Sequence, residues 1–215
     1  MPPAKTDHAA RRRDVSEAVW KVMASQGFGG LTLRAVAAQL GASTGLVTHY
    51  FPSKQALVAH ALAILEERTE QRPRRVPPAE GIAALRTALL DILPLSAPDT
   101  VSNRIWVGSW DTALADPQLG ADQAARDDRS RARLRRHVEA AQQRGELPAD
   151  ADPERLAVMA LAFTHGLVVQ ALFSPALFPP ERQQQLVDDF LAALRAQAVP
   201  GAGSAGQGPE MISPL

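Results

Sequence analysis

The chain has 215 residues, a formal net charge of zero and 46% hydrophobic residues, so it can bury a core as one large or two small domains. It contains no cysteine, which excludes a disulfide framework, a thiolate nucleophile and a cysteine-ligated metal site. Aromatic residues make up only 5%, alanine and leucine abound, and alternating β-branched runs are missing, so we expect an all-α fold.

The zero net charge hides an asymmetry between the two ends of the chain. Residues 1–60 contain seven lysines and arginines against three acids, and no acid occurs between Glu17 and Glu66. A basic end on a neutral chain indicates a polyanionic partner such as nucleic acid for that end alone. The alternative, a merely solvated charged face, would intersperse both signs.

The N-terminal part predicts three helices. After a loose tail over residues 1–7, an amphipathic helix from about His8 to Gln26 ends at Gly27. Thr32 is the expected N-cap of a second helix, and Gly41 ends that helix. Ser43 caps a third, short helix that runs through Tyr50 before Pro52. Two short helices around a glycine-centred turn form a helix-turn-helix, whose second helix can enter the major groove of DNA.

The same stretch resembles the N-terminal signature of the TetR family of transcriptional regulators. The matching positions are Thr32, Ala35-Val36-Ala37, Gly41-Ala42-Ser43, Gly45, Tyr50-Phe51 and Ser53-Lys54. The run from Ser43 to Phe51 is most similar to the betaine-operon (BetI-like) branch, although Thr48 stands where most members carry tyrosine. The resemblance implies a homodimer that binds palindromic operator DNA, represses transcription and responds to a small-molecule effector.

The third helix offers the side chains for reading DNA. We expect its exposed face to meet base edges through Ser43, Thr44, Gly45, Thr48 and His49. Tyr50, Lys54 and Thr32 suit phosphate contacts, whereas Phe51 packs between the third and fourth helices. Arg11, Arg12 and Arg13 are either a solvated run or an arm that follows the phosphates.

The segment Gly41-Ala42-Ser43-Thr44-Gly45 also matches the G-x-S-x-G pattern of serine hydrolases. That chemistry needs a strand before the serine, and here a helical stripe precedes it. We therefore expect no catalytic residue and no enzyme, with a hydrolase built on Ser43 as an unfavoured alternative. No motif in the sequence requires a cofactor or a metal.

The remaining helices predict the domain plan. We expect a DNA-binding domain at 1–50, a connection at 51–74, a second domain at 75–199 and a disordered tail at 200–215. A helix from Ser53 to about Glu70 forms most of the connection. Further helices are expected over 79–93, 101–115, 118–144, 153–173 and 180–198. The last two carry apolar stripes suited to a four-helix dimer interface. The charge-rich run 126–136 is expected to form a solvated helix face.

A ligand pocket is predicted in the second domain. Trp106 and Trp110 form an i, i+4 pair on one helix, and Phe163 and His165 lie on a later one. Such residues can hold an apolar or cationic molecule, although ordinary helix-bundle core remains an alternative for each. Asp111 and His137 are further candidates for the pocket. A second domain that serves assembly alone, without an effector, also stays open.

No apolar run of the sequence approaches the roughly 18–20 residues of a membrane span, and the N-terminus lacks the apolar region of a signal peptide. We therefore expect a cytoplasmic protein without a membrane partner.

Overall fold

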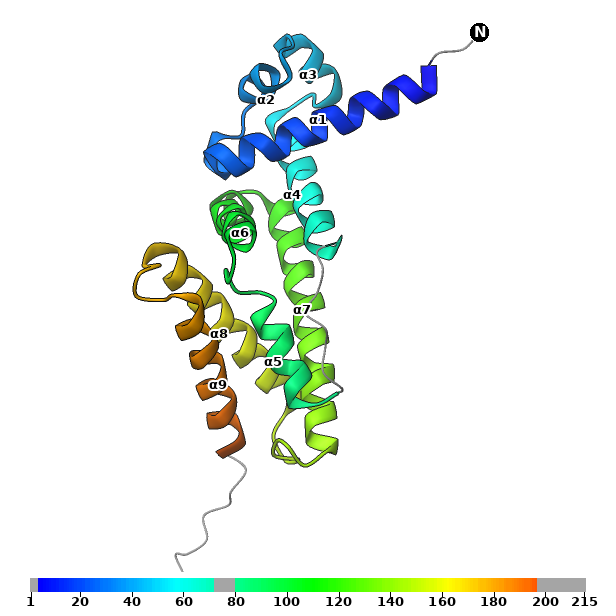
Figure 1. Cartoon of the computed structure of the whole chain (residues 1–215). Helices are drawn as coiled ribbons and strands as arrows, with labels where there is room; N and C mark the ends of the chain where they lie inside the picture. Colours follow the sequence, from blue (N-terminus) through cyan, green and yellow to red (C-terminus); the bar gives the residue numbers. More distant parts are fainter. Residues whose placement is uncertain (1–3, 72–79, 197–215) are drawn as a thin grey trace, which may run out of the picture.

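The computed structural model describes residues 4–71 and 80–196, and within these ranges the secondary structure is helical, without a strand. This confirms the expected all-α class. A head formed by residues 4–50 lies at one end, and the remaining helices extend away from it as a bundle (Figure 1). The helices are α1 Ala4–Gln26, the 3-10 turn η1 Phe28–Gly30, α2 Leu33–Leu40, α3 Thr44–Tyr50, α4 Lys54–Gln71, α5 Ile82–Leu90, α6 Ala97–Ala115, α7 Pro117–Gln143, α8 Pro153–Phe173 and α9 Pro180–Ala196.

Several helix bounds differ from the sequence expectation. The first helix begins at Ala4 rather than near His8. The sixth begins at Ala97 rather than Val101, because the Ser96 side chain caps it by accepting a hydrogen bond from the Asp99 amide (3.3 Å). Pro98 therefore lies in the first helical turn, where its missing N–H costs no hydrogen bond. The expected boundary at 73–78 and the tail at 200–215 lie outside the described residues.

The first hydrophobic core belongs to the head. Helix α1 packs on α2 and α4, and α2 packs on α3. The core side chains from these helices are fully or almost fully buried; they include Val19, Val22, Val36, Val47, Leu57 and Leu65.

Helices α6 and α7 also contribute to this first core. Ile105 and Ala113 of α6 and Leu119 of α7 are buried in the same cluster. Helix α6 approaches the turn η1 closely, since a Cβ atom added at Gly108 would lie 3.2 Å from Phe28 Cβ. The head and the bundle therefore share a continuous apolar contact through α6.

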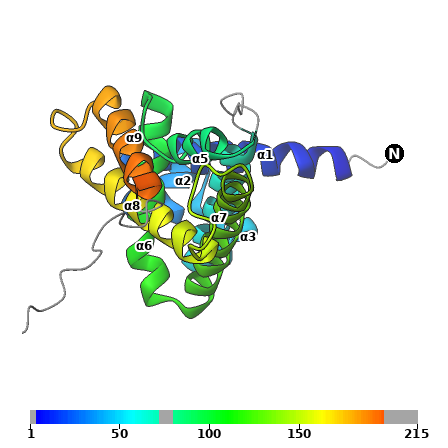
Figure 2. The same cartoon turned by 90° about the horizontal axis from the view of Figure 1, so that it is seen from below.

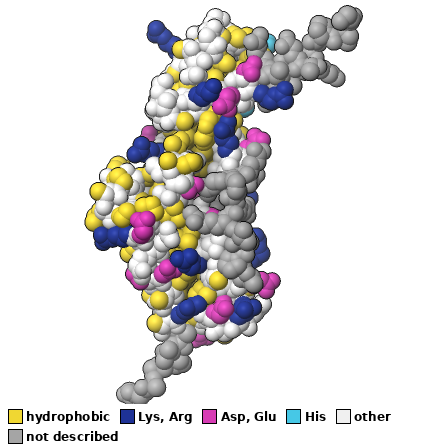
Figure 3. Space-filling model, viewed as in Figure 1, with side chains coloured by type: hydrophobic (Ala, Val, Ile, Leu, Met, Phe, Trp, Pro, Cys, Tyr) yellow, Lys and Arg dark blue, Asp and Glu magenta, His cyan; other side chains and the backbone are white. Residues whose placement is uncertain are grey.

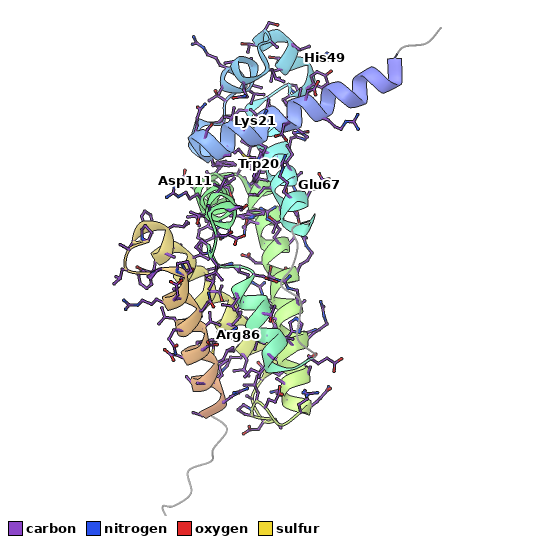
Figure 4. All side chains as sticks on the ribbon, viewed as in Figure 1. Trp20, Lys21, His49, Glu67, Arg86 and Asp111 are labelled. Atoms are coloured by element: carbon purple, nitrogen blue, oxygen red, sulfur yellow. The ribbon has the colours of Figure 1, made fainter. Side chains whose placement is uncertain are left out.

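The second core lies between α5, α7, α8 and α9. Figure 2 views these helices from below, with α8 beside α9 and α5 beside α7. Its buried side chains include Leu85, Leu89, Leu134, Val138, Leu156, Leu167, Val187 and Leu194. An ion pair joins α5 to α9 beside this core. Arg86 of α5 (labelled in Figure 4) donates to both carboxylate oxygens of Asp188 of α9, at 2.5 and 2.9 Å. This bond lowers the pKa of the Asp188 carboxyl.

Helix α8 is apolar on nearly every side. By length and composition it could cross a membrane, with a mean hydropathy of 1.9, which corrects the expectation that no segment approaches a span. However, 44% of that window is buried inside the fold. Val158 and Phe173 of α8 and Leu177 beyond it are exposed, and Figure 3 shows hydrophobic side chains gathered where α8 leads into α9.

Candidate nucleic-acid interface and ligand cavity

Local hydrogen bonds fix the ends of α2 and α3 and the turn between them. The Thr32 side chain accepts a bond from the Ala35 amide (3.0 Å) and caps α2, while the Ser43 side chain accepts one from the Leu46 amide (3.3 Å) and caps α3. Gly41 has φ 63°, the left-handed conformation that glycine adopts without steric cost. All three end signals expected from the sequence are confirmed, and a helix rather than a strand precedes Ser43.

Helix α3 presents one face to solvent and buries the other. Val47 is fully buried, whereas the predicted base-contacting residues Ser43, Thr44, Gly45, Thr48 and His49 are all exposed. The Thr48 hydroxyl donates to the Thr44 carbonyl (2.8 Å), which leaves its methyl group and an oxygen lone pair available. An added Cβ at Gly45 would find only Ser43 Oγ nearby, at 3.8 Å, so a flat surface can approach the backbone closely there.

The predicted phosphate-contacting residues border this exposed face. Thr32 and Lys54 are exposed at the first turns of α2 and α4, and Tyr50 is half-buried with its ring edge-on to His49 (5.5 Å between centroids). Figure 4 shows His49 at the head. Phe51 is buried against the His60 ring of α4 (4.9 Å), which confirms its expected packing role. Arg13 is exposed on α1, and the side chains of Arg11 and Arg12 lie outside the described part of the structure.

A cavity of about 460 Å³ lies between the head and the second core. Its walls come from α4, the turn after α5, α6, α7 and α8. The lining includes Glu66, Thr69, Asp91, Ile92, Asn103, Trp106, Val107, Trp110, Gln123, Arg126, Asp127, Arg129, Arg133, Arg136, Leu161, His165 and Val168.

Three of the four residues predicted for a pocket meet at this cavity. Trp106 and Trp110 line it from α6, and His165 lies beside Trp110 with 5.7 Å between ring centroids. Burial lowers the pKa of the His165 imidazole, which Asp127 partly opposes, so the neutral form is favoured.

The fourth residue, Phe163, does not line the cavity. Its ring stacks on Phe190 of α9 at 4.4 Å, on another side of α8, because apolar neighbours surround that helix. Asp111 is exposed on α6 (Figure 4), and neither it nor His137 belongs to the lining.

The charge-rich run 126–136 forms the expected solvated face only in part: Asp128, Arg129, Arg135 and Arg136 are exposed, but four of its arginines also border the cavity. Arg126, Arg129, Arg133 and Arg136 line the cavity from α7, and we call these four residues the arginine wall. The spacing of i, i+3, i+7 and i+10 sets them on one helical face, a periodicity that the sequence already contained. The guanidinium of Arg126 lies over the Trp106 ring at 4.7 Å, a cation–π contact.

Polar contacts fasten α4 to its neighbours on either side of the cavity. Arg129 of α7 donates to Glu66 of α4, an ion pair at the cavity lining. Gln55, near the start of α4, donates to Asp116 at the corner between α6 and α7 (3.3 Å). On the side of α1, Arg68 pairs with Glu17 (2.5 Å) and lies 4.4 Å from the Trp20 ring centroid. Glu66 borders the cavity and belongs to α4, whose other side chains pack in the core of the head, so a change at Glu66 can reach the head through α4.

Comparison with known proteins decides the family. Residues 16–61 match the family described as bacterial regulatory proteins, tetR family, and residues 81–196 match the BetI-type transcriptional repressor C-terminal domain. The chain belongs to the TetR family. It is a DNA-binding transcriptional regulator, and the relatives that it matches are transcriptional regulators.

Curated TetR-family relatives match over nearly their whole length. The transcriptional regulator PksA of Bacillus subtilis is 24% identical over 190 residues, which cover 86% of this chain and 90% of PksA. The regulator BetI of Cronobacter sakazakii is 28% identical over 196 residues, covering 88% of this chain and 93% of BetI.

Solved structures share the TetR-family fold. A transcriptional regulator from Rhodococcus sp. Rha1 superposes with a TM-score of 0.71 at 26% identity, covering 88% of this chain and 98% of its own. A regulator from Saccharomonospora viridis, solved in complex with choline, gives a TM-score of 0.72 at 22% identity, covering 86% and 96%.

Proposed function

We propose that this TetR-family protein is a ligand-relieved repressor that binds a palindromic operator as a homodimer in the cytoplasm. Residues 1–50 contact DNA, 51–74 connect, and 75–199 bind the effector and dimerise. The observation that carries this proposal is the shared wall of the cavity. Helices α4 and α6 both line it, and both also contribute side chains to the core beneath α3.

The mechanism follows from the fixed pitch of DNA. Two recognition helices of a dimer must lie about 34–36 Å apart to enter successive major grooves on one face. A ligand that displaces α4 or α6 changes this separation through their contacts with the head. It need only bind the wrongly spaced state more tightly than the other.

Dimerisation is assigned to α8 and α9. Val158 and Phe173 are 45% and 80% exposed, and the small residues Ala162 and Gly166 are exposed between them. This spacing places them along one stripe of α8, where small side chains permit a close helix–helix approach. A contiguous exposed apolar stripe of this kind is typical of an interface.

The choline complex of the Saccharomonospora viridis regulator supports an effector site in a protein of this fold. A DNA-binding protein whose second domain serves assembly alone is the alternative function. The cavity favours the ligand-responsive function, because its volume lies within the usual range of roughly 300–1,000 Å³ for small-molecule sites.

Selection of operator sequences from random duplex DNA tests the proposal. We expect Lys54→Ala to weaken binding to all sequences alike and to reduce the salt slope by about 2, since it removes one phosphate contact from each subunit of the dimer. His49→Ala and Thr44→Ala should instead change which bases are preferred, because these side chains lie on the groove-facing surface.

Asp150→Asn, at an exposed position in the turn between α7 and α8, serves as the control and should leave both readouts unchanged. Failure to enrich any sequence would contradict the proposed function. An unaltered base preference in both α3 variants would instead contradict the assigned recognition face.

A further inference from the structure

The lining of the cavity is rich in positively charged hydrogen-bond donors. The arginine wall supplies four guanidinium groups against the carboxylates of Glu66, Asp91 and Asp127. These carboxylates already interact with the protein: Arg129 donates to Glu66, the Gln123 amide donates to Asp127 (3.0 Å), and Asp91 also has an interaction of its own. Four guanidinium groups against three carboxylates give the lining a net positive charge.

Arg126 shows this surplus most clearly. Its Nε atom is buried without a hydrogen-bond partner, and one of its terminal nitrogens donates to Gln123 Oε1 (2.9 Å). Burial lowers the pKa of Arg126, although the nearby acids Glu66, Asp122 and Asp127 oppose that effect. Arg126 is half-buried, and a partly desolvated guanidinium is stabilised by an anionic acceptor, with which it forms charge-assisted bonds.

The aromatic side of the cavity does not offer a cage for a cation. The Trp106 ring that could attract an ammonium group already lies beneath the Arg126 guanidinium, at 4.7 Å from its centroid. Trp110 lies against His165. A cationic ligand here would also face the four like charges of the arginine wall. Apolar side chains complete the lining and can receive a hydrocarbon body; they are Ile92, Val107, Leu161 and Val168.

We propose that the effector is a small organic anion with an apolar body, whose acidic group binds the arginine wall and draws Arg129 away from Glu66 of α4. This inference rests on the proposed function and specifies the ligand class of that site. It replaces the apolar or cationic molecule expected from the sequence.

The Arg129–Glu66 pair gives the anion a route to the head. A carboxylate ligand and the Glu66 carboxylate compete for the same guanidinium, so ligand binding and the α4–α7 contact oppose each other. Loss of that contact removes one of the polar contacts between α4 and α7, and α4 carries buried side chains of the first core, so a shift of α4 at this point is passed to the head. By reciprocity, operator binding weakens ligand binding by the same factor.

Binding of three probes with one body and different head groups tests the ligand class. They are 3-phenylpropionate, its amide and 3-phenylpropyl-trimethylammonium, titrated into the full chain and followed by calorimetry and tryptophan fluorescence. We expect the carboxylate to bind at least about tenfold more tightly than the other two, a difference typical of charge-assisted bonds.

Matched variants locate the anion site. Arg126→Gln should weaken carboxylate binding by about tenfold and leave amide binding unchanged. Arg135→Gln is the control on the same helix, because Arg135 pairs with Glu139 and Glu154 outside the lining and should change neither affinity. Equal or tighter binding of the amide or the ammonium probe, or no carboxylate binding at about 10 mM, would overturn the proposal.

Glu66→Gln tests the competition. We expect this variant to bind 3-phenylpropionate more tightly than wild type and to release its operator less when the probe is added, because the competing carboxylate is gone. Unchanged probe affinity in Glu66→Gln would refute the competition for Arg129.

The two proposals fail separately. Operator selection without any ligand measures the proposed function, whereas the head-group series measures the ligand class. If only the ammonium probe released the operator, the proposed repressor function would stand and the proposed anionic effector would be contradicted.

Discussion

At the scale of single residues, two glycines of the recognition motif act for different physical reasons. Gly41 takes a left-handed φ of 63° with open space around it, so its requirement is conformational. Gly45 lies inside α3 with ordinary helical geometry and an exposed face, so nothing in the free protein requires a glycine there. The need for Gly45 arises only if a DNA surface approaches the helix.

Alanine substitutions separate these two roles. Gly41→Ala should destabilise the fold by about 1–2 kcal/mol, the cost of a left-handed L-residue. Gly45→Ala should leave stability unchanged or raise it by about 0.5 kcal/mol, yet weaken operator binding, because the methyl group faces the groove. Urea unfolding and operator titration measure the two effects. Full operator affinity in Gly45→Ala would show that DNA does not approach this backbone.

At the scale of elements, helix α5 depends on a distant cap. Gly81 precedes it at φ 92°, and the Ile82 amide donates to Glu146 Oε2 (2.8 Å) from the turn after α7. This bond, with a lesser contribution from Arg144, lowers the pKa of the Glu146 carboxyl. The carboxylate therefore replaces the side-chain cap that glycine cannot supply.

The stabilisation by Glu146 should depend on pH. A carboxyl whose folded-state pKa is lowered stabilises the fold above its unfolded pKa, and that contribution disappears as the pH falls through the folded value. Glu146→Gln should therefore lower Tm at pH 7. The difference should persist near the ordinary glutamate pKa of about 4.3 and close at more acidic pH. Thermal unfolding followed by circular dichroism measures it, and a gap that stays constant with pH would contradict the assignment.

The helices show what local patterns can and cannot predict. The caps at Thr32, Gly41 and Ser43 were predictable, because each depends on hydrogen bonds within three or four residues. The start of α6 was not recognised, because Pro98 indicated a break although Ser96 two residues earlier is the true cap. The cap of α5 comes from Glu146, 64 positions away, and no local pattern specifies such a contact.

Predicting which residues line the cavity also requires tertiary contacts that no local pattern contains. Trp106 and Trp110 were predictable as neighbours from their i, i+4 spacing. Phe163 was misplaced because α8 is apolar on most sides, so periodicity does not tell which partner each side chain faces. A charge run alone predicts a solvated face, because charged side chains normally lie in water. The sequence does not show that neighbouring helices leave a cavity beside this face, bordered by the arginine wall.

At the scale of the whole molecule, the proposed dimer predicts a coupled loss. Val158→Glu puts a charge on the exposed apolar stripe of α8, so it should dissociate the dimer and abolish tight operator binding together. Leu114→Glu is the matched control, because Leu114 is 90% exposed and lies near the end of α6, outside the two helices assigned to the dimer interface. Sedimentation velocity and operator titration measure both. A wild-type chain that sediments as a monomer at micromolar concentration would contradict the dimer.

The shared packing of α6 limits how this protein could be recombined. Ile105, Ala113 and Leu119 complete the apolar core of the head, although they follow it by some forty residues or more in the sequence. A chimera that joined another regulator's first 71 residues to this bundle would pair two surfaces that had not evolved together. Grafts of new DNA specificity onto this chain should therefore be confined to the exposed residues of α3, or else carry the facing side of α6 with the head.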